Sequence, residues 1–589
     1  MAEYVRKQVR SFQQTVKDKR KLSGWIIPRQ QSSFADEGTW WASSPLLNDS
    51  SSRKQDQHRH GRDASRTPDL GSLDHVRLLV LGRAECAGMG SSSRHTRRGS
   101  DLVGGLLLRR SQTDISRREA VYCIILGNLV TTIPLVLNGA VGARLHIPFP
   151  VAMRSSFGWY FSRFAVVTRM ITALFWHAIQ TYTGSTAITQ CIRAIWPSYL
   201  DLPNHLPSSA GITSQQLLSH FIFWSIQFPF LLTPPHKLKW FFVFKAVVVL
   251  VSSVAVVIAM TLEAGGTGDI WRQEDAVTGE TRSWLILSSM SSITGSWATM
   301  ATNIPDFTRY LDRPNGVYWQ VVFLPAIQIV LGLFGIIATS AAKVVYGRYI
   351  WDPVALAGEW QGPSGRAGAF FVGFTWCVAQ IGTNLSANVI SCANDLTSLF
   401  PKYINIRRGV VLTTVTAAWI MVPWKIVSSA SSLLTFMSGL GIFLAPISAI
   451  LGADFWVVKR RRVDVPALYR AHGGYRYNHA GTNWRAVVAF LVSVVPNIPG
   501  MAATVNPSLT GKVRGAVKIY SIFYLWGFSS AFAAYCLLSV VFPARETLVR
   551  ETVSGDAEVF PQEMSDESRS LSTRDPEKKA DTSIGVDSV

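Results

Sequence analysis

The stretch that decides the fold begins with Arg154-Ser155-Ser156-Phe157-Gly158 and leads into a long apolar run that carries Phe175-Trp176-His177-Ala178-Ile179-Gln180-Thr181. This run follows a basic loop and is too apolar to lie in water. Its tryptophan and glutamine stand four residues apart and therefore share one face of an α-helix. Because an amide both donates and accepts hydrogen bonds, Trp176 and Gln180 together suit a small, flat, polar ring. The alternative is that Trp176 packs against lipid or protein, while Gln180 joins two helices by hydrogen bonds.

The composition indicates a membrane protein. Of the 589 residues, 48% are hydrophobic and 16% are charged, whereas soluble proteins have about 25% charged residues. Apolar runs near the roughly 20 residues that cross a bilayer recur along the chain, so we expect an all-α polytopic membrane protein. The formal charge of +20 does not indicate nucleic acid as a partner, since the basic residues 53–118 lack interleaved aromatic side chains. The positive-inside rule explains much of that charge, and the expected surroundings are a lipid bilayer.

The six cysteines are scattered without the spacing of a metal site, and five lie in or beside apolar runs. We interpret them as small buried residues, with neither a disulfide framework nor a metal site, and we expect no cofactor. They are Cys86, Cys123, Cys191, Cys377, Cys392 and Cys536.

The chain divides into four regions. Residues 1–28 are predicted to be a cytoplasmic N-terminal tail, and residues 29–118 form an irregular Ser/Arg-rich segment. Residues 119–543 are predicted to be a transmembrane transporter domain, and residues 544–589 a disordered cytoplasmic C-terminal tail. The predicted spans of the third region are 119–142, 160–194, 217–233, 239–262, 283–304, 317–345, 368–397, 408–427, 431–457, 485–505 and 516–542.

Basic and non-basic loops alternate along the chain. Residues 197–214 have no Lys or Arg and residues 263–281 are mostly acidic, whereas Lys459-Arg460-Arg461-Arg462 is strongly basic. The basic loops should be cytoplasmic. The helix at 119–142 then begins outside, so a cytoplasmic N-terminus requires one further span before it. The sequence therefore predicts that a spanning helix is missing at residues 29–118. We expect the chain in this form to stay in the endoplasmic reticulum and not to transport.

The run from Ser291 to Asp306 is apolar enough to span, but Gly, Ser, Thr, Asn and Pro interrupt it. Irregular backbone survives at membrane depth only where protein or a water-filled cavity satisfies its polar groups. A discontinuous helix of this kind is typical of substrate sites at the middle of the membrane. Trp297, close to Gly295, supplies a second aromatic plate. The alternative is a kink with no ligand.

A second polar run, from Ala379 to Ser391, places Asn384 and Asn388 four residues apart among small residues. Small residues allow helices to approach closely, and hydroxyl and carbonyl oxygens can coordinate a hard cation. The alternative is hydrogen bonding between helices and nothing more.

Two ionisable residues lie within apolar runs. Lys245 is a functional candidate because of its depth, but it stands near the cytoplasmic end of its helix, and we expect its ammonium group to extend to the interface. His177 is next to Trp176 but on another helical face, and we expect a packed, hydrogen-bonded histidine rather than a proton carrier.

The motifs FPVAMRSSFGWY, FWHAIQTYTG, GSWATMATNIPDFTRY, TNLSANVISCANDLTSLFPKYINIRRG and FLAPISAILGADFWVVKRRRVDVPALY resemble the nucleobase–cation symporter family 1, in its fungal uracil/allantoin permease branch. The resemblance covers about residues 119–543, with a shorter echo in KRKLSGWIIPRQQSSFADEGTW near the N-terminus. It implies twelve helices, of which the first ten form two inverted five-helix repeats with the first and sixth helices broken. About eleven of these are recognisable. The first has no counterpart, which suggests that residues 41–113 derive from a retained intron or a reading-frame error.

The resemblance also implies a substrate site. Trp176 and Trp297 match the two plates that sandwich the substrate ring, Gln180 and Asn388 match the residues that bond to its edges, and Gly295 matches a backbone contact at the break.

In the same way, Ala379, Gly382 and Thr383 match one half of the cation site of the family. Gly382 stands where the family has a hydroxyl residue, and this places sodium binding in doubt.

The function implied is that of a permease, not an enzyme: a secondary active transporter that imports a nucleobase or a related heterocycle, such as uracil or allantoin. A proton is the expected co-transported ion, ahead of sodium, and the expected location is the plasma membrane. The alternative is a degenerate, non-transporting membrane protein or a substrate sensor of the same fold.

Overall fold

The computed structural model describes residues 117–553 apart from positions 234, 269–278, 312, 351, 428–429 and 510–511. The predictions for residues 1–116, including the missing helix, and for residues 554–589 lie outside the described residues. The described part is helical, with one isolated β-bridge between Asp464 and Val553. Residues 544–553 belong to the predicted tail, and here Val553 exchanges backbone hydrogen bonds with Val463 and Val465, each of 3.1 Å.

Every predicted span is a helix or a series of helical pieces. The main helices are α5 (Arg117–Leu145), α6 (Phe149–Phe157), α7 (Ser162–Ile195), α8 (Ser214–Leu231), α9 (Lys239–Glu263), α10 (Gly279–Ser296), α11 (Ala298–Asn303), α12 (Pro305–Thr308), α13 (Gln320–Tyr346), α14 (Pro353–Ala357), α15 (Gly362–Thr383), α16 (Ile390–Leu399), α17 (Ile406–Val415), α18 (Pro423–Val427), α19 (Ala430–Ala453), α20 (Trp484–Val494), α21 (Ile498–Val505), α22 (Arg514–Ser521) and α23 (Phe523–Val541). Three π-helical turns, η8 (Asn384–Val389), η9 (Thr416–Ile420) and η10 (Asp454–Val458), continue α15, α17 and α19.

Six stretches in the described part are long and apolar enough to cross a membrane by length and composition: Glu119–Leu145, Lys239–Glu263, Pro314–Tyr346, Ser438–Val458, Trp484–Val505 and Phe523–Val541. The other predicted spans are helical but interrupted or more polar. Among them are α7, the broken pair α10 and α11, and α15 with η8 and α16. These are the elements that carry the candidate site residues, because a polar site lowers the hydropathy of the helices that form it.

The predicted discontinuous helix is confirmed. α10 ends at Ser296 and α11 begins at Ala298, so Trp297 stands at the break. The Trp297 amide donates to the Thr294 carbonyl at 3.1 Å, a tighter turn than an α-helix makes. Pro305 then begins α12. The polar run at 379–391 contains a second irregularity, the π-helix η8, which lies between α15 and α16.

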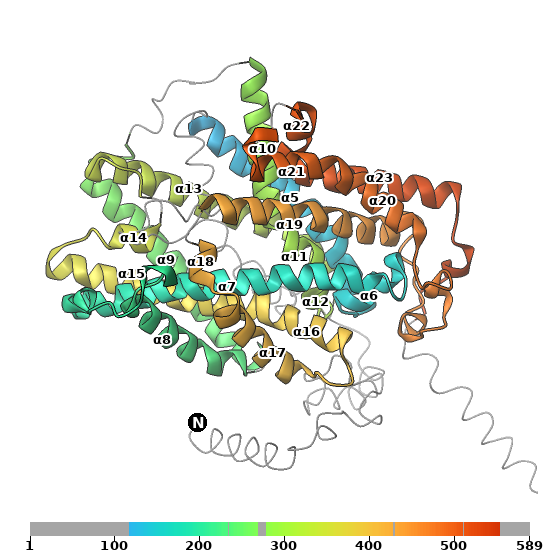
Figure 1. Cartoon of the computed structure of the whole chain (residues 1–589), viewed down its shortest axis with the longest axis horizontal. Coiled ribbons are helices and arrows are strands. Elements are labelled where there is room, and N and C mark those ends of the chain that lie inside the picture. The colour runs from blue at the N-terminus through green and yellow to red at the C-terminus, as the bar shows by residue number, and fades with distance from the viewer. Residues whose placement is uncertain are drawn as a thin grey trace, which may run out of the picture.

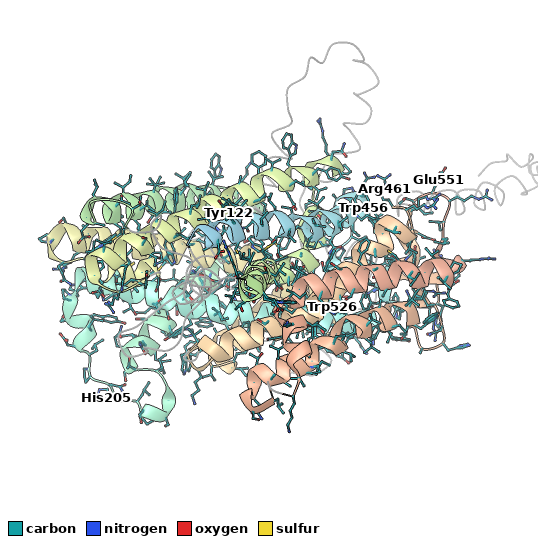
Figure 2. The ribbon with its side chains drawn as sticks, turned by 90° about the horizontal axis from the view of Figure 1, so that it is seen from above. Tyr122, His205, Trp456, Arg461, Trp526 and Glu551 are labelled. Atoms are coloured by element: carbon teal, nitrogen blue, oxygen red, sulfur yellow. The ribbon has the colours of Figure 1, made fainter. Side chains whose placement is uncertain are left out.

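α7, α19 and α23 run roughly along the longest axis of the molecule, and α5 and α10 are steeply inclined to them (Figure 1). α7 packs against α8 and α15, α5 packs against α10 and α13, and α19 packs against α20 and α23. Figure 2 shows His205 at one end of the bundle and Arg461 with Glu551 at the other. The loop that lacks Lys and Arg and the strongly basic loop therefore lie at opposite ends, as the predicted alternation requires.

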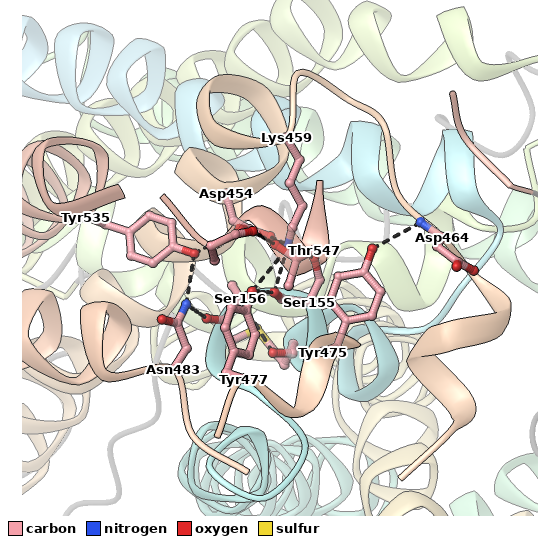
Figure 3. A network of polar contacts seen from close by, with 12 residues as sticks. Ser155, Ser156, Asp454, Lys459, Asp464, Tyr475, Tyr477, Asn483, Tyr535 and Thr547 are labelled. Carbon is pink, nitrogen blue, oxygen red and sulfur yellow. Dashed lines mark hydrogen bonds and ion pairs between the residues drawn. The ribbon is translucent and has the colours of Figure 1, made fainter. Parts of the chain in front are cut away.

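The Arg154–Gly158 stretch was expected to be a loop, and this is wrong: most of it lies in α6, which ends at Gly158 with φ +91°. Ser155 of this stretch connects α6 to Asp454, which directly follows α19, by a hydrogen bond (Figure 3). Asp454 accepts hydrogen bonds from Ser155 Oγ at 2.7 Å, Lys459 Nζ at 2.8 Å and Tyr535 OH at 2.8 Å. Burial lowers the pKa of Lys459, and Asp454 opposes that effect. The motif is therefore part of a buried polar junction.

Candidate functional site

Trp176 and Gln180 lie on α7 as the sequence predicted, one turn apart, with exposed fractions of 7% and 2%. The Trp176 ring packs edge-to-face on Phe175, with 6.2 Å between centroids, in a cluster with Ile179 and Val427. The buried Gln180 amide needs hydrogen-bond partners, which a polar ligand can supply, since an unmade bond is costly.

Trp297 is buried at the break between α10 and α11. It packs in a second cluster with Leu135 of α5 and Leu324 of α13. Gly295, two residues earlier, faces α23, because a β-carbon there would lie 2.5 Å from the Phe523 ring. The absence of a side chain at Gly295 is thus explained by helix packing.

Trp176 lies on α7, which packs against α11, and Trp297 directly precedes α11. Their helical segments are therefore in contact. The two tryptophans belong to separate hydrophobic clusters. Stacking of a substrate ring between Trp176 and Trp297 stays a prediction.

Asn388 lies in η8 at 1% exposure, and its amide is tied to α7 and α8 through Asn384. Asn388 Nδ2 donates to Asn384 Oδ1 at 3.0 Å. Asn384 Nδ2 in turn donates to Thr181 Oγ1 at 3.3 Å and to Gln227 Oε1 at 3.1 Å. The predicted hydrogen bonding between helices is therefore present, and it includes a candidate ligand residue. The Asn388 carbonyl oxygen is buried without a partner in the described chain.

The three candidate cation residues, Ala379, Gly382 and Thr383, are buried near the end of α15. Lys245 of α9 lies directly against Gly382: a β-carbon on Gly382 would collide with Lys245 Cδ and lie 3.2 Å from Nζ. The Lys245 side chain is fully buried. The expectation that Lys245 extends to the interface is therefore wrong, because glycine at 382 leaves a space that admits the lysine stem.

His177 is fully buried and its Nε2 lies 3.0 Å from Thr414 Oγ1 of α17. This confirms the prediction of a packed, hydrogen-bonded histidine.

Sequence reasoning missed Gln227 and three buried charged residues, Arg169, Asp306 and Asp395. Gln227 is an amide in the apolar helix α8, and that contrast with its neighbours was the available signal. Asp306 and Asp395 stand in the quoted motifs, Asp306 in the first turn of α12 and Asp395 within α16.

Comparisons with known proteins identify the family of the chain. Residues 103–527 match the family described as "Permease for cytosine/purines, uracil, thiamine, allantoin". The chain belongs to this permease family. Among its relatives, an uncharacterized permease of Schizosaccharomyces pombe is 39% identical over 439 residues, 74% of this chain and 78% of the relative. The uracil permease of Saccharomyces cerevisiae is 34% identical over 420 residues, 69% of this chain and 66% of the relative.

Among solved structures, the chain is similar to Mhp1, a nucleobase-cation-symport-1 family transporter in a closed conformation with bromovinylhydantoin bound. The TM-score is 0.60 at 21% identity, over 80% of this chain and 94% of Mhp1. This likeness shows the fold, and it confirms the predicted fold class, an all-α transporter with five-plus-five inverted repeats. The permease is thus a multi-pass membrane transporter and not an enzyme.

Proposed function

We propose that this permease imports a nucleobase-like heterocycle, such as uracil or allantoin, across the plasma membrane by proton symport. The observation that carries the proposal is the meeting of α7, with Trp176 and Gln180, and the broken helix at Trp297 in a family described by these substrates. The uracil permease of Saccharomyces cerevisiae supports uracil as the first compound to test.

In this mechanism the substrate ring lies between Trp176 and Trp297, and Gln180 and Asn388 bond to its edges. Each aromatic contact contributes about 0.5–1.5 kcal/mol. Matched hydrogen bonds supply the discrimination, since a buried amide left unpaired costs roughly 1–3 kcal/mol. Transport follows when the two repeats alternate the access to this fixed site.

Proton coupling is supported by the place of Lys245. A sodium site on α15 would use an oxygen ligand at position 382, where this chain has glycine and the lysine stem fills the space. The Lys245 ammonium group brings a positive charge to the place where the resemblance puts the cation. We infer that the Lys245 side chain occupies the place of the metal ion, so that a proton rather than sodium accompanies the substrate.

The test is uptake of radiolabelled uracil in a permease-deficient yeast that expresses the full chain, with and without a restored first helix, and with a fluorescent tag for localisation. Unlabelled allantoin, uridine, uric acid and cytosine serve as competitors. For the form with a restored first helix, we expect saturable uptake that a protonophore abolishes, that sodium does not stimulate and that Lys245→Met uncouples from the pH gradient. Sodium-dependent uptake that is insensitive to the protonophore would overturn the coupling. Surface protein without uptake of any compound, in both forms of the chain, would overturn the function.

A further inference from the structure

We propose that Asn388 is fixed as a hydrogen-bond acceptor by a relay through Thr181, Gln227 and Asn384, so that the site selects rings that present an N–H group at that position. The inference rests on the proposed function and deepens it, because it names a chemical feature of the substrate and two positioning residues outside the implied site.

The relay begins at a group of fixed polarity. The backbone carbonyl of His177 can only accept, and the Thr181 hydroxyl lies 2.8 Å from it. Thr181 therefore donates its one proton to His177. The Thr181 oxygen is left with two lone pairs, so its other neighbours must be donors.

Two amides meet those lone pairs. Gln227 Nε2 lies 3.2 Å from Thr181 Oγ1, and Asn384 Nδ2 lies 3.3 Å from it. The second proton of Asn384 Nδ2 is directed to Gln227 Oε1 at 3.1 Å. Each donor has an acceptor and each acceptor a donor, and all three side chains are fully buried. A flip of either amide would place two nitrogens or two oxygens against one another.

The polarity then passes to Asn388. Because Asn384 uses its nitrogen twice, it offers its oxygen, and Asn388 Nδ2 donates to that oxygen at 3.0 Å. The Asn388 amide is thereby anchored by its nitrogen. The carbonyl oxygen of the same amide group is buried and has no partner in the described chain. The two asparagines stand in the π-helix η8, a form that is frequent at functional sites.

A substrate that reaches Asn388 therefore meets an acceptor and has to supply a donor. A ring N–H flanked by carbonyl groups, as in uracil and in the hydantoin ring of allantoin, meets that requirement. A ring nitrogen that carries a lone pair at the same place repels the Asn388 oxygen and leaves two acceptors unpaired. Gln227 and Thr181 act on the substrate only through Asn384 and Asn388.

The test measures equilibrium binding of tritiated uracil to membranes that contain the full chain, with and without a restored first helix. Two competitors each lack one of the two ring N–H groups of uracil. Cytosine has an unprotonated nitrogen at ring atom N3, and pyrimidin-4(3H)-one has one at ring atom N1. We expect at least one of them to bind the wild type roughly tenfold or more weakly than uracil. Thr181→Val removes the hydroxyl that fixes the orientation of the amides, so the amides can flip together. The ratio of uracil affinity to competitor affinity should then fall severalfold. Thr181→Ser, which keeps the hydroxyl, should retain the wild-type ratio.

A second variant separates orientation from position. Gln227→Met leaves Asn384 oriented by Thr181, so both affinities should fall together while their ratio is kept. If Thr181→Val binds uracil and leaves the ratio unchanged, the relay is overturned and the permease function stands. Equal wild-type affinity for uracil and both competitors would also overturn the relay and leave the permease function standing. If neither the full chain nor its form with a restored first helix binds any of these rings, the proposed function fails and the relay falls with it.

Discussion

The Arg169 guanidinium of α7 lies 3.9 Å from the Asp306 carboxylate of α12, measured from Nη2 to Oδ2, and both side chains are fully buried. The same Arg169 pairs with Asp395 of α16 and donates to the Ser391 carbonyl at 2.7 Å. One arginine thus links the segment that follows the broken helix to α7 and α16.

Removal of Arg169 should be costly. Arg169→Met removes the guanidinium that two buried carboxylates share, and a buried pair broken on one side costs about 3–5 kcal/mol. We expect a large drop in the midpoint of thermal unfolding in detergent. Asp306→Asn is the matched control, because it keeps the pair of Arg169 with Asp395 and should destabilise less. Equal unfolding midpoints for Arg169→Met and the wild type would contradict this role.

Substitution of either candidate plate should abolish uptake. In the form with a restored first helix, we expect Trp176→Ala to reach the cell surface at the level of its parent and to lose transport, because the ring loses one of its aromatic contacts. Trp297 also packs at the helix break, and Trp297→Ala would cost about 3–5 kcal/mol of folding free energy, so Trp297→Phe serves as the folded control. Uptake per surface molecule is the measurement. Normal uptake by Trp176→Ala would refute the sandwich.

Lys245 and Gly382 should be energetically coupled. A β-carbon at position 382 collides with the Lys245 stem, so Gly382→Ala should destabilise the protein by about 1–3 kcal/mol. When Lys245→Ala has removed the lysine stem, Gly382→Ala should change the folding free energy very little. A double-mutant cycle on thermal stability measures this coupling, expected at about 0.5–3 kcal/mol. Additive effects would show that the two residues do not meet.

The first helix should decide whether the chain transports. An inverted-repeat transporter needs both broken helices to enclose its site, and here the second is at Trp297. We expect a version with an apolar helix restored in place of residues 41–113 to reach the surface and take up uracil or allantoin, and the 589-residue chain to be retained. Confocal localisation and uptake in the same cells provide the comparison. Saturable uptake at the surface by the unaltered chain would contradict the prediction.

The apolar runs and their flanking charges determined the membrane class, the helix positions and the alternation of the loops, since helix length and loop charge are local properties that a bilayer reads directly. The break at Trp297 was also local, because Gly, Ser and Pro mark it. Tertiary structure decided what the polar residues meet. Whether Lys245 reaches the interface or lies over Gly382, and which end of the Asn388 amide remains without a partner, depend on helices far apart in the sequence. Burial fixes both outcomes, because a polar group without water takes whichever partner the packing supplies.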